Sequence, residues 1–217
     1  MLGQGVLGIS VTYLIGLLMV VLVFVFGKMW DRKFPTEIQK SGWSSGTIAK
    51  VAVLIAVAAA GGFISIPGPA ASIKLDSTAG YFASLMFGWQ IGSIVAAFGT
   101  FFANLMSGFS GWAAMVPYYM MNMALASLAF GYVSKRYNLV AGMIVGTIVN
   151  TLCILPWFLM LGWGIMVPIL IPQIVGSFAN CFLASVAYKA ITAASKRKKN
   201  IDIDDDESDG ENSTVNQ

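Results

Sequence analysis

The 217-residue sequence contains no histidine and few charged residues, and these absences exclude several classes of function. Without histidine the chain has no Ser-His-Asp triad, no histidine metal site and no histidine proton relay. The two cysteines, Cys153 and Cys181, stand apart in apolar runs, so they form neither a CxxC site nor a secreted disulfide framework. Charged residues make up 11% of the chain and hydrophobic residues 57%, whereas an average soluble chain has about 25% charged residues. The composition therefore predicts an integral membrane protein.

The charged residues fall in four places, and the apolar stretches between them predict the helices. They lie between Lys28 and Lys50, at Lys74 and Asp76, at Lys135 and Arg136, and from Lys189 to the C-terminus. The intervening stretches reach or approach the ~20 residues that cross a bilayer, and backbone in lipid must satisfy its own hydrogen bonds. We predict seven helices with soft boundaries, at residues 6–26, 48–63, 78–87, 89–106, 113–133, 139–161 and 165–188.

The division between the third and fourth helices depends on the distribution of basic residues. Residues 78–106 could form one helix or two helices broken at Phe87-Gly88-Trp89-Gln90. Basic residues near helix ends collect on the cytoplasmic side, and only the break places 12 of the 13 Lys and Arg residues there, with Lys74 alone outside. We therefore predict the break, with a short third helix that tilts or packs inside the bundle. The same argument predicts a multi-pass cell-membrane protein with its N-terminus outside and its C-terminus in the cytoplasm.

The chain divides into four predicted segments. Residues 1–27 form an N-terminal transmembrane helix, which we expect to be an anchor and not a cleaved signal, because no charge precedes it and basic residues follow it. Residues 28–47 are a polar cytoplasmic linker, and residues 48–190 are a six-helix membrane domain. Residues 191–217 are rich in charge, cannot bury apolar area, and are predicted to form a disordered cytoplasmic tail. The predicted fold is an all-α integral membrane bundle of six helices plus one additional N-terminal helix.

Uncharged polar and aromatic residues are the candidates for function inside the membrane. No charged residue lies in the middle of a predicted span, which argues against a proton-driven carrier or a voltage-gated channel. No Walker motif is present, so the chain cannot hydrolyse ATP by itself. Amides in lipid either join helices or line a pocket, and rings either anchor at the interface or stack on a ligand. Because most of them fall in the outer half of four helices, we predict an outward-opening pocket lined by Asn104, Tyr118, Tyr119, Asn122, Asn150, Trp157, Gln173 and Asn180.

The loop between the second and third predicted helices is external under this topology. It carries Pro67, Gly68 and Pro69, which favour a defined turn, and it holds Lys74 and Asp76. The loop is either a lid over the pocket or an ordinary connector.

The second predicted helix carries a stripe of small residues at a spacing of four, Ala52, Ala56 and Ala60. Such a stripe lets another helix approach closely. It serves either packing within the bundle or the docking of a partner subunit.

These features, together with the stretch of residues 73–92, resemble the substrate-binding (S) subunits of energy-coupling factor (ECF) transporters. That family has six helices, both core termini inside, an alanine-rich first helix, and a lid loop after it. The turn Phe87-Gly88-Trp89-Gln90, with Gly92, is similar to the family's "fGp..G" turn, although Trp89 replaces the familiar proline. The resemblance covers residues 48–190, and the N-terminal helix departs from the six-helix plan.

The resemblance implies a transport subunit and not an enzyme, one that captures a vitamin or related micronutrient for an ATP-driven importer. It implies a membrane coupling (T) subunit, contacted by Ala52, Ala56 and Ala60, and two ATPase subunits as partners. It implies no cofactor, no metal and no nucleic acid. The cobalt and nickel S subunits rely on an N-terminal histidine, and because this chain lacks histidine it does not resemble them in this respect.

The candidate substrate follows from charge and from a further resemblance. A core without charge suits a neutral ligand. The run Met106-Ser-Gly-Phe109, followed by Met115-Val-Pro-Tyr118, is similar to S subunits assigned to α-ribazole, a neutral benzimidazole riboside and cobalamin precursor. α-Ribazole is therefore the leading hypothesis and riboflavin the next. A stand-alone facilitator or channel is the alternative function, and a membrane scaffold or enzyme ranks last.

Overall fold

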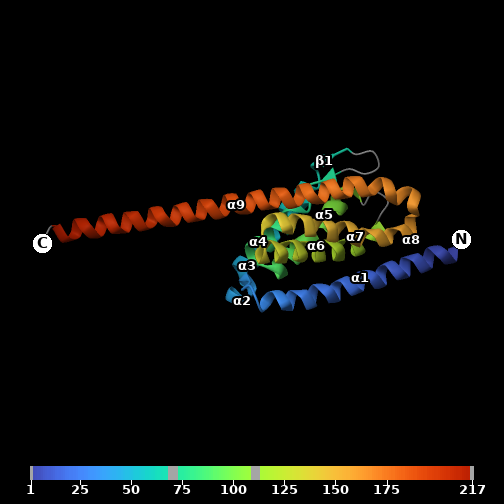
Figure 1. Cartoon of the computed structure of the whole chain (residues 1–217), viewed down its shortest axis with the longest axis horizontal. Helices are drawn as coiled ribbons and strands as arrows, with labels where there is room; N and C mark the ends of the chain where they lie inside the picture. Colours follow the sequence, from blue (N-terminus) through green and yellow to red (C-terminus); the bar gives the residue numbers. More distant parts are fainter. Residues whose placement is uncertain (1, 68–72, 109–112, 216–217) are drawn as a thin grey trace.

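The computed structural model describes residues 2–67, 73–108 and 113–215, and these are mostly helical (Figure 1). The helices are α1 (Leu2–Asp31), α2 (Glu37–Ser41), α3 (Ser45–Gly61), α4 (Thr78–Phe87), α5 (Trp89–Met106), α6 (Val116–Arg136), α7 (Leu139–Ile154), α8 (Phe158–Leu161) and α9 (Trp163–Val215). Single 3₁₀ turns, η2 (Ala113–Met115) and η3 (Leu155–Trp157), precede α6 and α8. Two short antiparallel strands, β1 (Ser65–Ile66) and β2 (Ile73–Lys74), form a hairpin between α3 and α4.

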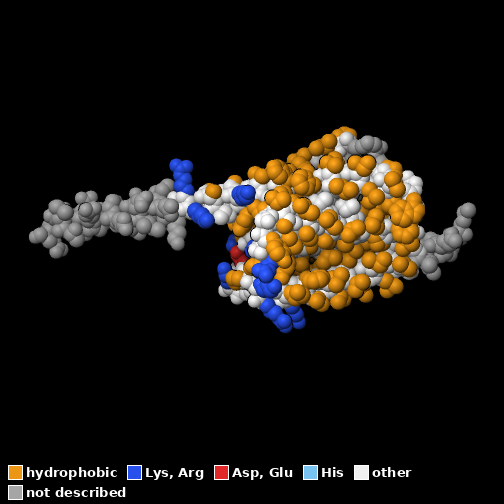
Figure 2. All heavy atoms as spheres, in the orientation of Figure 1, with side chains coloured by type: hydrophobic (Ala, Val, Ile, Leu, Met, Phe, Trp, Pro, Cys, Tyr) orange, Lys and Arg blue, Asp and Glu red, His pale blue; other side chains and the backbone are white. Residues whose placement is uncertain are grey.

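The surface of the bundle is apolar along the length of its helices. Within the described residues, five helical segments are long and apolar enough to cross a membrane, at Gly8–Asp31, Trp89–Met106, Ala113–Arg136, Leu139–Trp157 and Trp163–Lys198. Figure 2 shows a broad hydrophobic surface, with Lys and Arg side chains gathered at the end of the bundle where α2 lies. The predicted all-α membrane fold with one additional N-terminal helix is confirmed.

The break between the third and fourth predicted helices is present, and Gly88 forms the turn. Its φ of +105° lies in a region that residues with a Cβ rarely adopt. Beyond the turn, α4 and α5 run side by side at backbone contact. A Cβ added to Gly92 would lie 2.4 Å from the Cβ of Ser84, and one added to Gly80 would lie 2.6 Å from the Cβ of Ala96. Small residues at the facing positions therefore allow the hairpin to close.

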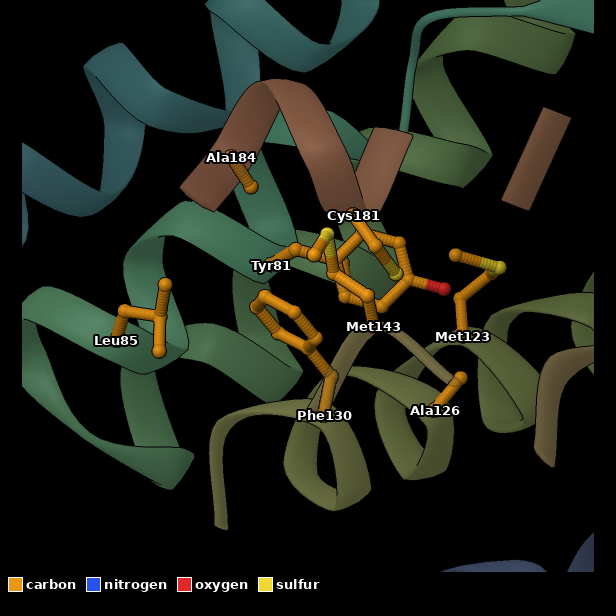
Figure 3. Packing of buried hydrophobic residues seen from close by; sticks show 9 residues of the cluster. Tyr81, Leu85, Met123, Ala126, Phe130, Met143, Cys181 and Ala184 are labelled. Carbon is orange, nitrogen blue, oxygen red and sulfur yellow. The ribbon is translucent and has the colours of Figure 1, made fainter. Parts of the chain in front are cut away.

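The short helix α4 packs inside the bundle, as its length predicts. It contacts α3, α5, α6 and α9, and most of its residues are buried. Tyr81 is completely buried and meets Phe130 of α6 edge to face, with ring centroids 5.1 Å apart. Figure 3 shows these rings among Leu85, Met123, Ala126, Met143, Cys181 and Ala184, which form the core cluster. With Ala96 of α5, which also belongs to the cluster, this core joins α4, α5, α6, α7 and α9.

Helix α1 is seated on the bundle along α6. Trp30, near its end, is fully buried between Phe34 and Tyr132, at 6.0 Å from each ring. Asp31 accepts hydrogen bonds from the indole nitrogen of Trp89 at 2.8 Å and from the amide of Gln90 at 3.3 Å. The additional helix is thus attached to the α4–α5 turn at the charged end of the bundle.

The chain between α1 and α3 is ordered by side-chain caps. Helix α2, which was not predicted, begins with a capping box in which Thr36 and Gln39 bond each other's backbone amides. Ser44 caps α3, because its hydroxyl accepts a hydrogen bond from the backbone N–H of Thr47 at 3.2 Å. A Cβ on Gly88 would lie 2.6 Å from the Cγ2 of Thr36, so the linker packs directly on the α4–α5 turn.

Two predicted segments differ from the structure. The sixth predicted helix does not run unbroken to residue 161, because α7 ends at Ile154 and η3 and α8 follow it. Pro156 lacks a backbone N–H and interrupts the helical hydrogen bonds at this point. The tail predicted to be disordered is instead helical to Val215, as part of α9. Extending an existing helix avoids the cost of nucleating a new one, and nearly all of residues 191–198 are exposed.

Candidate functional site

A cavity of about 410 Å³ lies at the end of the bundle opposite α2, within the ~300–1,000 Å³ range of small-molecule sites. Its walls come from β2, the start of α4, the end of α5, the start of α6, the end of α7 with η3, and the first half of α9. The lining residues are Ile73, Lys74, Asp76, Ser77, Asn104, Tyr119, Asn150, Ile154, Trp157, Ile165, Ile169, Pro172, Gln173, Gly176, Ser177 and Asn180.

Six of the eight predicted site residues line this one cavity: Asn104, Tyr119, Asn150, Trp157, Gln173 and Asn180. Lys74 and Asp76 of the predicted lid loop line it as well. Pro67 is exposed, and Gly68 and Pro69 lie outside the described residues. The structure thus brings together side chains that are up to 106 positions apart in the chain.

Asn180 connects β2 to the bundle. Its amide nitrogen donates hydrogen bonds to the backbone oxygens of Lys74 and Gly176, both at 2.8 Å, and its amide oxygen accepts one from Thr78 at 2.7 Å. Both amide hydrogens are therefore used within the protein. Asn180 therefore both lines the cavity and holds β2 against α9 through the hydrogen bond to Lys74, a connection that we call the latch.

A chain of amides crosses α6, α7 and α9 behind the cavity. Asn122 is completely buried and donates to the amide oxygen of Asn150 at 3.1 Å, and the amide nitrogen of Asn150 donates to Ser177 at 2.6 Å. Asn122 is not among the cavity-lining residues, and its hydrogen bond holds the Asn150 amide in a defined orientation. The amide oxygen of Asn122 has no hydrogen-bond partner among the described residues.

Tyr118, a predicted site residue, is not among the residues that line the cavity. Its hydroxyl donates to the backbone oxygen of Cys153, and its ring packs in a cluster with Met19 and Val23 of α1. Neighbouring residues on an α-helix point about 100° apart, so Tyr118 and Tyr119 can face different surroundings. Tyr119 faces the cavity and Tyr118 faces α1.

The cavity contains one acidic and one basic side chain. Asp76 is 7% exposed and accepts a hydrogen bond from Ser77 at 3.0 Å. Burial raises the pKa of the Asp76 carboxyl, while the Ser77 hydrogen bond and the charge of Lys74 act in the opposite direction. The ammonium of Lys74 donates to the hydroxyl of Ser107 at 3.1 Å. With both groups ionised, the lining has no net charge.

The remaining walls are aromatic and aliphatic. Tyr119 and Trp157 meet edge to face with ring centroids 5.9 Å apart, and Ile154, Ile165 and Ile169 are further lining residues. Pro168 and Pro172 lie inside α9, and each proline removes one helical hydrogen bond there. The site can therefore offer flat apolar contact together with directed hydrogen bonds.

Several lining residues were missed in the sequence, among them Ser77, Gly176 and Ser177. On α9 a signal was present: Ile169, Gln173, Gly176, Ser177 and Asn180 recur at intervals of three and four, which marks one face of a helix. Extending this face from the two predicted amides would have found Ser177. Ser77 precedes α4 and follows no such period.

The alanine stripe of α3 lies on the outside of the bundle. Ala52, Ala56 and Ala60 are exposed, whereas Ala58 and Ala59 are buried. A Cβ on Gly99 of α5 would lie 2.5 Å from the Cβ of Ala58, so the buried face already packs at close range. The exposed stripe is a separate, smooth face.

Comparisons with known proteins agree with this architecture. The family model for "ECF transporter, substrate-specific component" matches residues 46–192. A solved structure described as "Structure and mechanism of the S component of a bacterial ECF transporter" has a similar fold, with a TM-score of 0.58 and 23% sequence identity. The match covers 70% of this chain and 98% of that one. No curated protein matches the chain.

Proposed function

This chain belongs to the substrate-specific (S) components of ECF transporters, and we propose that it captures a neutral aromatic micronutrient of the α-ribazole type in the cavity described above. As an S component it is a substrate-binding transport subunit and not an enzyme. ATP hydrolysis then belongs to two partner ATPase subunits, which act through a membrane coupling (T) subunit.

The composition of the cavity lining is the observation that carries the proposal. Asn104, Asn150 and Gln173 offer amides for directed hydrogen bonds, and Tyr119 and Trp157 offer rings. The amide nitrogen of Asn104 already donates to the Thr100 carbonyl at 2.8 Å, which orients its oxygen. Lys74 and Asp76 balance each other in charge, and an ionic ligand would need an unbalanced counter-charge. A neutral, flat, hydrogen-bonding ligand fits these groups.

We further propose the orientation and the coupling surface. The cavity faces outside and the end bearing most Lys and Arg residues faces the cytoplasm, following the positive-inside rule. The T subunit docks on Ala52, Ala56 and Ala60, because exposed small side chains allow close helix approach in lipid.

The test begins with the full chain purified in lipid nanodiscs. Mass spectrometry identifies any small molecule retained by the protein, and calorimetry measures the binding of α-ribazole and of riboflavin. We expect α-ribazole to bind and Asn150→Leu to weaken it about tenfold, since one hydrogen bond is lost and its buried partners are left unpaired. Asn138→Ser, at the cap of α7, keeps a capping oxygen and serves as the control.

The outcomes separate the candidate functions. Binding of riboflavin alone would reassign the ligand, and binding of neither would reject a ligand of this type. Purification from its native membrane should recover a T subunit and ATPases. Uptake in cells that lack the coupling module would instead favour the stand-alone facilitator.

A further inference from the structure

Helix α1 lies outside the segment that the family model covers, yet it contacts the wall of the cavity. It packs against α6, α8 and η3. Its sequence carries small residues on the packed side, at Gly8, Thr12 and Gly16. Thr12 is 1% exposed, and its hydroxyl donates to the backbone oxygen of Gly8 at 2.8 Å.

Two glycines set how closely α1 approaches this wall. A Cβ on Gly8 would lie 2.7 Å from the backbone oxygen of Leu159 in α8. A Cβ on Gly16 would lie 2.9 Å from the sulfur of Met121 and 3.1 Å from the ring of Tyr118. The hydroxyl of Tyr118 donates in turn to the backbone oxygen of Cys153, one helical turn before Trp157. Helix α1 thus reaches the wall directly at α8 and indirectly through Tyr118.

The wall segment between α7 and α9 consists of two short helical pieces. Between α7 and α9 the chain forms the single 3₁₀ turn of η3 and the four residues of α8, and it ends at Gly162 with a φ of +73°. Pro156 removes a backbone donor within it. Such short pieces depend on packing for their position. Ile154 and Trp157, which flank this proline, both line the cavity.

From these contacts we infer that α1 is a positioning element of the substrate site, which holds η3 and α8 so that Trp157 forms the cavity wall beside Tyr119. Trp157 packs against the same cluster that contains Met19 of α1 and Tyr118. The inference rests on the proposed function, because it assigns α1 to the same cavity. It goes beyond anchoring, because α1 then affects substrate affinity without touching substrate.

The experiment inserts a side chain between α1 and α8 in the full-length protein in nanodiscs. Gly8→Val is the main variant, and Gly8→Ala is a smaller insertion that keeps the test open if valine prevents folding. Leu18→Val, on the 56% exposed face of the same helix, is the matched control. Hydrogen exchange of residues 155–161 is measured without ligand, and α-ribazole affinity is measured in parallel.

We expect exchange of residues 155–161 to rise about tenfold in Gly8→Val, by local opening, with a smaller rise in Gly8→Ala and no change in Leu18→Val. Exchange in α4 should stay unchanged, and α-ribazole should bind about tenfold more weakly. Unchanged exchange at 155–161 in a folded Gly8 variant would overturn the inference, as would an equal rise throughout the bundle. If α-ribazole fails to bind the wild-type protein, the ligand proposal fails while the exchange result still decides the role of α1.

Discussion

Replacing Asn180 by leucine should loosen the β2 segment from the bundle. Asn180 is 2% exposed, and its amide joins β2, through the backbone oxygen of Lys74, to α9 and to Thr78 at the start of α4. Leucine has a similar size but neither donates nor accepts a hydrogen bond. The substitution therefore removes this connection with little change in volume.

The magnitude follows from the groups left without partners. The bond to Gly176 is local to α9 and contributes little to holding β2. Loss of the Lys74 bond leaves a carbonyl oxygen unpaired, and loss of the Thr78 bond leaves a hydroxyl without its acceptor. A net cost of about 1–2 kcal/mol corresponds to a factor of roughly 5–30 in the opening equilibrium.

Hydrogen exchange of residues 73–77 in the ligand-free protein measures this opening. We expect exchange to rise in Asn180→Leu by the factor given above, and ligand dissociation to accelerate in parallel. Thr78→Val is the control, because it removes the Thr78 bond but leaves the bond to Lys74 in place. Equal exchange at 73–77 in Asn180→Leu and wild type would refute the latch.

Three further predictions concern coupling, pH and the attachment of α1. Ala56→Leu should abolish co-purification of the T subunit while ligand affinity stays unchanged. Burial raises the pKa of Asp76 in the folded protein above 3.8. The stabilisation of the folded protein that follows from this raised pKa is fully present below pH 3.8, and it is lost as the pH rises through the raised pKa. The melting temperature of wild type relative to Asp76→Asn should therefore fall over that range, and a constant difference would contradict it. Trp89→Phe removes the hydrogen bond to Asp31 and should cost about 1 kcal/mol in thermal unfolding, and an unchanged free energy of unfolding would contradict this.

The sequence was most informative about features that depend on the positions of charged residues and of amides within apolar helices. The distribution of Lys and Arg predicted the break at Gly88, because nearly all basic residues fall on one side of the membrane only if residues 78–106 form two helices and not one. Amides are costly in lipid, so their positions indicated the cavity, and six of the eight predicted residues line it. Tyr118 was predicted together with Tyr119 because hydrophobic patterning does not distinguish the two faces of an apolar helix, and its ring packs with α1.

Other features leave little trace in the sequence. The strands β1 and β2 have two residues each, too few for an alternating pattern. The packing of α1 depends on which side of an almost wholly apolar helix meets α6, and the contacts of the folded chain reveal that side. The end of α7 was missed because Pro156 lies in a run that is apolar on both sides.

The position of α1 makes encounters within the plane of the bilayer directional. Helix α1 packs on α6 and α8, whereas α3 packs on α4 and α5, so the two helices cover different sides of the bundle. A neighbour that collides on the α1 side meets protruding Leu14, Leu17 and Phe24, each more than half exposed. A neighbour that arrives at α3 meets Ala52, Ala56 and Ala60 among larger side chains. Under the proposed docking at α3, only lateral collisions on that side of the bundle bring the smooth face to the T subunit.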